Sequence, residues 1–182
     1  MQAATRYATP AMLVHWLTAV LVLSALGLGY YLSGLSLSPT KLQLISYHKW
    51  LGVTVLLLFL PRLLLRLSKP APKPIDTMAL WQRTVAAATH RLLYALLLAV
   101  PLSGWLMSSA KGFPVVYLGL LPLPDLVGKD QSLGDFLKSV HEILTLGLLT
   151  LVGLHIAAAL KHHFIDRDET LVRMAPVFKR SN

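Results

Sequence analysis

The 182-residue chain is 55% hydrophobic and only 14% charged, a balance that excludes an ordinary soluble domain. It has no cysteine, so disulfides, cysteine-ligated iron–sulfur clusters, thiol nucleophiles and covalent haem attachment are excluded as well. A spanning helix needs about 20 apolar residues, which leaves room for about four spans and no separate soluble domain. The sequence therefore predicts an integral membrane protein, with residues 1–182 forming a single transmembrane domain.

Four apolar blocks follow one another, at about residues 12–35, 45–65, 85–109 and 137–162. Each is long enough to cross a bilayer as a helix. Tyr30 and Tyr31 make a poor cleavage site near the end of the first block, so we interpret this block as a retained span rather than a signal peptide. Short links favour successive antiparallel helices. We therefore predict an all-α fold, an antiparallel four-helix bundle in the membrane.

The net charge of +9 is unevenly distributed along the chain. One side of the predicted bundle carries most of the cations: Arg6, Arg62, Arg66, Lys69, Lys73, Arg83, Arg91, Lys161, Arg167, Arg173, Lys179 and Arg180. The other side carries Lys41, Lys49, Lys111, Lys129 and Lys138. By the positive-inside rule, both termini are predicted to be cytoplasmic. We attribute the charge to topology and to contact with lipid, not to nucleic-acid binding.

Five histidines fall inside or at the edges of the apolar blocks: His15, His48, His90, His141 and His155. Ionisable side chains are costly in lipid and usually functional there, although a single one can simply hydrogen-bond to a neighbouring helix. The predicted topology sorts them into two layers. His48 and His141 lie near the periplasmic surface, whereas His15, His90 and His155 lie in the cytoplasmic half.

The fourth block carries two of these histidines on one face. His141 and His155 are 14 residues apart, which is within about 40° of a whole number of helical turns and about 21 Å along the axis. A zinc site or a single catalytic centre cannot use two histidines so far apart. Two haems can, because one histidine from each of two facing helices completes a bis-histidine iron site. The spacing leaves His15 and His90 open as partners of His155.

Small residues one turn beyond the histidines allow two interpretations. Gly52, Ala158 and Ala159 either make room for a porphyrin edge or serve ordinary helix packing. Other functions find less support, because the carboxylates that an ion-coupled carrier needs lie outside the spans except at the start of the fourth. Neither a Gly-x-Ser-x-Gly turn nor a His-Glu-x-x-His helix is present, so no motif of a hydrolase is found.

Histidine-containing segments and the tail form a distinctive set that spans all four blocks in order: Pro10–Trp16 (PAMLVHW), Tyr47–Gly52 (YHKWLG), His90–Tyr94 (HRLLY) running into Pro101–Trp105 (PLSGW), Lys138–Glu142 (KSVHE), Gly153–Phe164 (GLHIAAALKHHF) and Asp166–Met174 (DRDETLVRM). This set resembles the bacterial cytochrome b561 family. The resemblance implies a multi-pass protein of the bacterial inner membrane that binds two haem b groups. It implies His48 with His141 as iron ligands on the periplasmic side, and His15, in preference to His90, with His155 on the cytoplasmic side.

The resemblance also implies electron transfer between a periplasmic partner and the ubiquinone pool. The partner is superoxide in one type of relative, which makes the chain a candidate superoxide:ubiquinone oxidoreductase. Other relatives are membrane electron-transfer subunits or anchors of a separate redox enzyme, and this alternative stays open. The lysines of the periplasmic side would attract superoxide, but Asp125, Asp130, Asp135 and Glu142 lie on the same side.

A quinone site needs hydrogen-bond donors and a proton source near the cytoplasmic haem. His162 is seven residues after His155 and thus on nearly the same helix face, and His90 lies at a similar level. Both are candidates for a quinone pocket, while the alternative for His162 is an interfacial residue of a basic belt. Arg91 and Lys161 suit haem propionates or lipid phosphates equally well.

Overall fold

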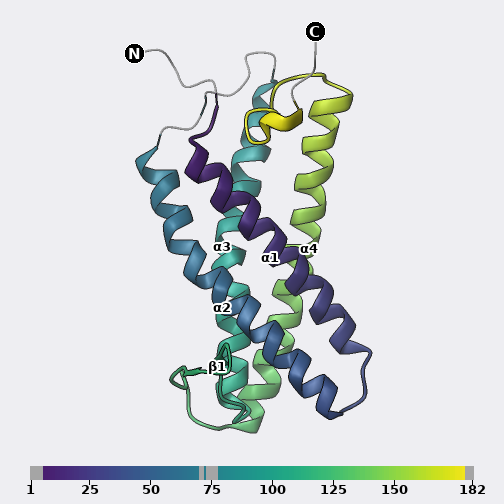
Figure 1. Cartoon of the computed structure of the whole chain (residues 1–182). Coiled ribbons are helices and arrows are strands. Elements are labelled where there is room, and N and C mark those ends of the chain that lie inside the picture. Colours follow the sequence, from purple (N-terminus) through teal and green to yellow (C-terminus); the bar gives the residue numbers. More distant parts are fainter. Residues whose placement is uncertain (1–5, 70–71, 73–77, 179–182) are drawn as a thin grey trace.

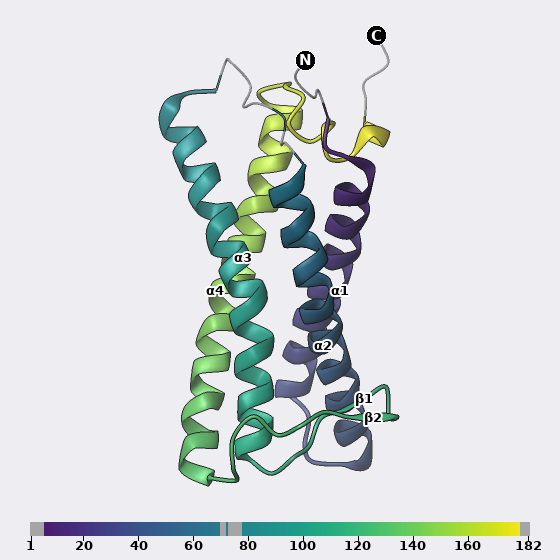
Figure 2. The ribbon, with the colours of Figure 1, turned by 90° about the vertical axis from the view of Figure 1, so that its left-hand side faces the viewer.

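Four helices run up and down in the computed structural model, which describes residues 6–69, 72 and 78–178. They are α1 (Thr9–Ser33), α2 (Pro39–Ser68), α3 (Leu80–Ala110) and α4 (Gln131–Phe164). A short hairpin of β1 (Val116–Tyr117) and β2 (Leu121–Pro122) lies between α3 and α4, and a 3-10 turn, η1 (Pro176–Phe178), follows α4. Figures 1 and 2 show that α1 begins and α4 ends at the same end of the bundle, which we call the terminal end. The end that carries β1 and β2 is the hairpin end.

The predicted all-α membrane bundle is confirmed, and all four helices are long and apolar enough to cross a bilayer. The helix bounds differ from the predicted blocks because capping residues set them. Ser38 accepts a hydrogen bond from the Lys41 amide at 3.2 Å, and Pro39 follows at the first helical position, where proline is favoured. Asp130 caps α4 by accepting from the Leu133 amide at 3.0 Å, so α4 begins six residues before the predicted block.

The core of the bundle is an apolar layer at mid-height, to which every helix contributes. Val100 is one member, and the other four lie seven residues after a histidine of the same helix and therefore on nearly the same face: Val22, Val55, Leu97 and Leu148, after His15, His48, His90 and His141. Along the bundle, α1 packs on α2, α2 on α3 and α3 on α4. Within the described helices, α4 makes no comparable backbone contact with α1 or α2.

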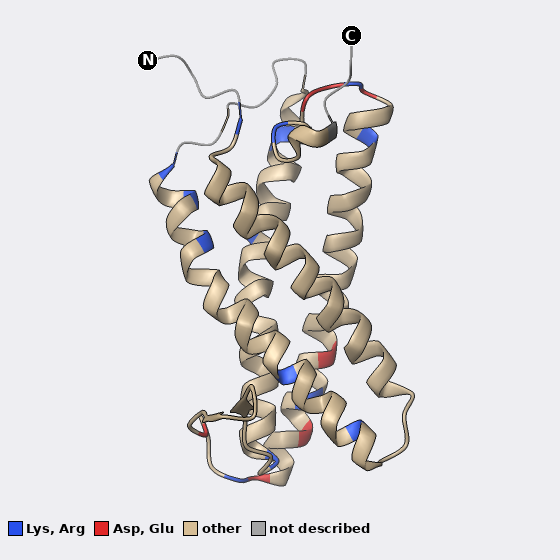
Figure 3. Cartoon of the chain, viewed as in Figure 1, with Lys and Arg blue, Asp and Glu red and all other residues tan. Residues whose placement is uncertain are grey.

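The outer surface of the helices is apolar, with Leu13, Leu57 and Leu146 among many large exposed side chains. Such a surface is stable only against lipid. Figure 3 shows the charged residues gathered toward the two ends of the bundle, with the middle of the helices uncharged. Four charged positions of the sequence lie outside the described residues: Lys73, Asp76, Lys179 and Arg180.

The link between α3 and α4 contains the short hairpin of β1 and β2. Its hairpin turns at Gly119, whose φ is +73°, a conformation that glycine adopts without strain. The link is fastened to α2, because Trp50 donates from Nε1 to the Val116 carbonyl at 2.7 Å and the hydroxyls of Thr54 and Tyr117 lie 3.0 Å apart. The link therefore lies beside the α2 turn that follows His48.

Candidate functional site

At the hairpin end, His48 of α2 faces His141 of α4. The centroids of the two imidazole rings are 6.4 Å apart and the ring planes are nearly perpendicular, at 88°. Both rings are half-buried. The structure therefore brings together the two residues that the sequence places in one layer, although they come from helices that do not pack closely on each other.

Residues of α3 fix the orientation of His141. The Nδ1 atom lies 3.0 Å from the Val100 carbonyl and 3.0 Å from the Ser103 hydroxyl, which itself donates to Val100 at 2.8 Å. Because a carbonyl only accepts, Nδ1 carries the proton and Nε2 keeps a free lone pair. A Cβ atom at Gly104 would lie 3.0 Å from Cε1 of His141. Glycine is therefore needed here for the ring to lie against α3.

His48 is supported in a similar way by α1. A Cβ atom at Gly29 would lie 3.1 Å from Cε1 of the His48 ring. The Nδ1 atom of His48 is buried and has no hydrogen-bond partner among the described residues. The ring of His48 therefore lies directly against α1.

Three histidines meet at the terminal end. The ring centroids of His15 and His155 are 6.3 Å apart with an interplanar angle of 63°, and those of His90 and His155 are 5.3 Å apart at 80°. His155 of α4 thus lies beside histidines of both α1 and α3. The two candidates that the sequence leaves open as partners of His155 are both within reach.

Hydrogen bonds distinguish these two candidates. Nδ1 of His90 donates to the Ala86 carbonyl at 2.7 Å, which leaves a lone pair on Nε2. Nδ1 of His15 instead lies 2.9 Å from the Arg62 guanidinium, which can only donate. In this state the neutral His15 ring carries its proton on Nε2, so metal binding at Nε2 requires Arg62 to release Nδ1.

The ring separations test whether the histidines fit a bis-imidazole iron site. With metal–nitrogen bonds of about 2 Å, an ion between two opposed imidazoles holds the ring centroids about 6 Å apart. The pairs His48–His141 and His15–His155 match this value at 6.4 and 6.3 Å, whereas His90–His155 is shorter, at 5.3 Å. The donor set and its spacing therefore fit the haem that the sequence implies.

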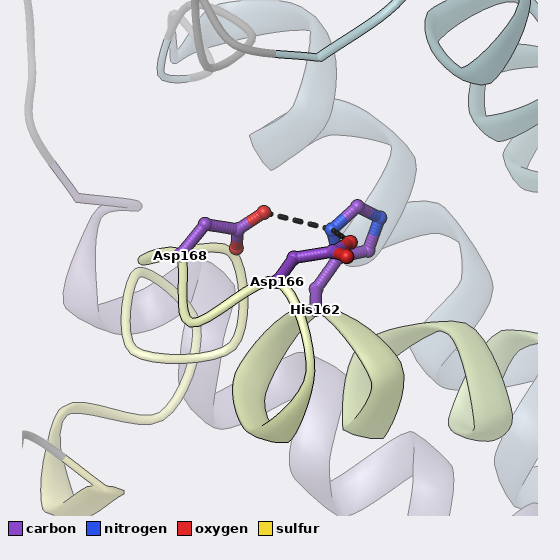
Figure 4. Close-up of side chains that lie close together, drawn as sticks. All are labelled: His162, Asp166 and Asp168. Atoms are coloured by element: carbon purple, nitrogen blue, oxygen red, sulfur yellow. Dashed lines mark hydrogen bonds and ion pairs between the residues drawn. The ribbon is translucent and has the colours of Figure 1, made fainter.

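His162, the other quinone candidate, is held by carboxylates of the segment after α4. Its Nδ1 lies 2.7 Å from Asp168 and 3.0 Å from Asp166, and both carboxylates converge on the ring in Figure 4. Burial raises the pKa of Asp168, but hydrogen bonds from Thr170 and His162 outweigh it and hold the pKa below its usual range. Asp168 is therefore ionised at neutral pH, and Nδ1 of His162 donates to it.

The three side chains drawn in Figure 4 have the donor types of a metal site, with ligand atoms within 4.8 Å of one another. However, Lys161 already pairs with Asp166 at 2.6 Å, and the Thr170 amide donates to Asp168 at 2.8 Å. We therefore interpret the group as a hydrogen-bonded His–Asp cluster. No hydrogen bond or ring contact joins it to His90 within the described part of the chain.

The sequence did not single out the residues that support the histidines. Gly29, Gly104, Ser103 and Arg62 each touch or flank an imidazole ring. Ser103 and Gly104 belong to the Pro101–Trp105 segment of the family resemblance, but their contact with a ring was not predicted. Conversely, Gly52 lies against Pro101 of α3, as the helix-packing interpretation of that residue expects. Only packing between helices reveals which small residue faces a ring.

Comparison with known proteins extends over most of the chain. The family model described as prokaryotic cytochrome b561 matches residues 6–176. Over 170 residues, 93% of this chain and 90% of the relative, the chain is 34% identical to cytochrome b561 homolog 2 of Escherichia coli strain K12. It is 30% identical to cytochrome b561 homolog 1 of the same strain, over 94% of this chain and 97% of the relative.

A third relative carries a more specific name. The chain is 29% identical to the probable superoxide oxidase CybB of Yersinia pestis, over 90% of this chain and 92% of the relative. The match to the family model covers the four helices and both histidine layers. The chain therefore belongs to the prokaryotic cytochrome b561 family, whose members transfer electrons in membranes and which implies b-type haem.

Proposed function

We propose that the chain binds two b-type haems, one between His48 and His141 and one between His15 and His155, and conducts electrons between the two faces of the bacterial inner membrane. The observation that carries this proposal is the pair of matching ring separations, 6.4 and 6.3 Å, at two heights along α4. When bound, b-type haem supplies an iron that gains and loses one electron. With a histidine held on each side, such an iron would have no free position for oxygen.

The orientation proposed for the chain puts the terminal end in the cytoplasm. Lys and Arg residues favour the cytoplasmic side, and the terminal end carries Arg62, Arg66, Lys69, Arg83 and Arg91 among others. The hairpin end then faces the periplasm. Electrons enter or leave there through the layer of His48 and His141.

Superoxide is the electron donor that we propose at the hairpin end. The name of the Yersinia pestis relative supports this choice. Two superoxide anions give up two electrons and leave as dioxygen, and one quinone takes up these electrons with two protons to form quinol. Electrostatic attraction of the anion is modest, because Lys111 pairs with Asp135 at 2.9 Å and Lys138 with Glu142 at 3.3 Å. Lys49, next to His48, is the cation that we expect to matter most.

Ubiquinone is the acceptor that we propose at the terminal end, with His162 as its proton donor. Nδ1 of His162 donates to Asp168, so Nε2 is the atom left to exchange a proton. A proton held at Nε2 produces an imidazolium whose charge faces two carboxylates. This arrangement resembles the carboxylate–histidine pairs that orient general acids.

Removing either member of this pair should slow quinone reduction specifically. We expect His162→Leu and Asp168→Asn to lower the rate of quinone-dependent haem reoxidation by about a hundredfold, the low end of the contribution of a general acid. The haem spectrum and reduction by dithionite should stay unchanged, because neither residue faces a proposed iron ligand. Wild-type reoxidation rates in both variants would exclude this cluster as the proton donor.

A leucine at position 104 tests the geometry of the hairpin-end layer. The Cβ atom alone would lie 3.0 Å from His141, so Gly104→Leu should displace the ring and lower the haem content from two per chain toward one. Gly27→Leu is the matched control, because nothing lies within 4 Å of a Cβ atom there. Pyridine haemochrome assays on the purified variants give the haem-to-protein ratio of each. Equal haem content in the two variants would contradict the proposed contact.

Stopped-flow mixing of the purified protein with superoxide tests the whole function. We expect rapid appearance of a reduced b-type α-band, followed by reoxidation that requires added ubiquinone. If superoxide did not reduce the haem but another protein did, the result would favour the alternative role, an electron-transfer subunit of a partner enzyme. A purified protein without a b-type spectrum would overturn the haem proposal itself.

A further inference from the structure

A small cavity at the terminal end borders the layer of facing histidines, because His15 is among its lining residues. It has a volume of about 50 Å³ and lies between the start of α1, the end of α2, α3 and the tail after α4. The tail is held in place there, because Trp16 donates from Nε1 to the Met174 carbonyl at 3.0 Å and the Tyr7 amide to the Arg173 carbonyl at 3.3 Å. The cavity is thus a fixed feature at the rim of the membrane.

Three cations of α2 line this cavity: Arg62, Arg66 and Lys69. They are spaced by four and then three residues, which puts them on one face of the helix. Together they extend over about 10 Å, from the histidine layer to the end of α2. None of the lining residues is acidic. Within the described part of the chain, no ion pair joins these cations to a carboxylate, in contrast to Lys161, which pairs with Asp166.

Arg62, the innermost cation, is incompletely satisfied. Its terminal nitrogens reach His15, and its guanidinium lies 5.4 Å from the centre of the Tyr94 ring. Its Nε atom is buried and has no hydrogen-bond partner among the described residues. A buried guanidinium donor without an acceptor is costly, so the cavity offers a place where an anionic oxygen would be stabilised.

The size and position of the cavity select the kind of anion. A single water needs about 10–15 Å³ of such volume, so 50 Å³ holds a group of several heavy atoms. Arg66 and Lys69 are exposed at the rim, where headgroups of a bilayer lie. Ala8, Ala11 and Leu65 supply an apolar wall. Two arginines and a lysine beside such a wall suit the phosphate of a phospholipid headgroup.

We propose that this cavity binds the phosphate of one anionic phospholipid, with Arg66 and Lys69 as the outer ligands and Arg62 as the inner one. A bound lipid would tie α1 and α2 to the C-terminal tail at the membrane surface. The ordinary alternative is a diffuse basic belt that attracts anionic lipid without a defined site. The cavity, the buried Nε atom and the absence of acidic lining residues favour a defined site.

The test compares two variants with the same loss of charge. Arg66→Gln/Lys69→Gln removes the two rim cations of the cavity, while Arg91→Gln/Arg167→Asn removes two exposed arginines of the terminal end that do not line it. Asparagine suits position 167, where φ is +56°. Native mass spectrometry of the full-length protein with added phosphatidylglycerol or phosphatidylcholine measures lipid retention, and the visible spectrum measures haem.

We expect one phosphatidylglycerol to stay bound to the wild type and to the Arg91/Arg167 variant. Retention by the Arg66/Lys69 variant should be about thirtyfold weaker, from the usual contribution of two cations near a membrane surface. Phosphatidylcholine should bind weakly to all three. Equal losses in both variants would overturn the proposal in favour of a diffuse belt. Lost haem with unchanged lipid retention would also overturn it, because the cations would then serve haem carboxylates.

Discussion

His141→Ala is expected to remove one of the two proposed b-type haems and leave the other in place. The imidazole of His141 is the proposed α4 ligand at the hairpin end, and it faces His48 at a ring separation of 6.4 Å. Alanine leaves His48 as a single ligand, whereas His155 lies about 21 Å away along α4 and keeps its own layer. The haem-to-protein ratio should fall from two to one, and the reduced α-band should lose one of its two components.

Two further measurements separate loss of a ligand from loss of the fold. Glu142→Gln, at the neighbouring exposed position, should keep both haems. Free imidazole should restore the missing component in His141→Ala, because the Val100 carbonyl and Gly104 leave a shaped space for the ring. Full occupancy of both haems in the alanine variant would show that His141 is not a ligand.

The second large effect concerns His15. We expect His15→Ala to lose the haem of the terminal end and His90→Ala to keep it, because only the His15–His155 separation of 6.3 Å suits an intervening ion. His90 lies closer to His155, at 5.3 Å, and Nδ1 of His90 is held by its own helix. Haem content and the α-band of the two variants decide between them.

The opposite result has an equally clear structural meaning. Arg62 donates to Nδ1 of His15 at 2.9 Å, so this ring must exchange its proton position before Nε2 can bind a metal, whereas His90 needs no such change. If His90→Ala lost the haem and His15→Ala kept it, this hydrogen bond would outweigh the ring separation. His15 would then be a partner of Arg62 and not an iron ligand.

The bundle and its two histidine layers follow from the sequence because they depend on local properties. Hydropathy determines the spans, and helical periodicity puts His141 and His155 on one face of α4. The choice between His15 and His90 depends on how α1 and α3 are rotated against α4. That rotation is set by contacts between distant residues, such as His48 against Gly29 and His141 against Gly104, which no local pattern specifies.

The conformation of the segment after α4 also could not be predicted from local sequence patterns. Periodicity predicts that His162 lies two turns beyond His155, but not that Asp166 and Asp168 fold back onto it. The reversal depends on Arg167, whose φ of +56° is uncommon for a residue with a side chain. A sequence pattern gives no reason to expect this conformation at an arginine. From the sequence, the proposed quinone site could therefore be predicted only by its depth in the membrane.

The apolar layer between the histidine layers determines which particles can cross the protein. Between the layers, residues 16–33, 50–61, 92–110 and 143–154 contain no Lys, Arg, Asp or Glu, and the centre is filled by valine and leucine. Protons have no chain of ionisable groups to follow through such a layer. If electrons pass inward and protons for quinol come from the cytoplasm, each turnover moves net negative charge inward. The reaction would then build membrane potential, and an opposing potential of 100 mV would cost it about 2.3 kcal/mol per electron.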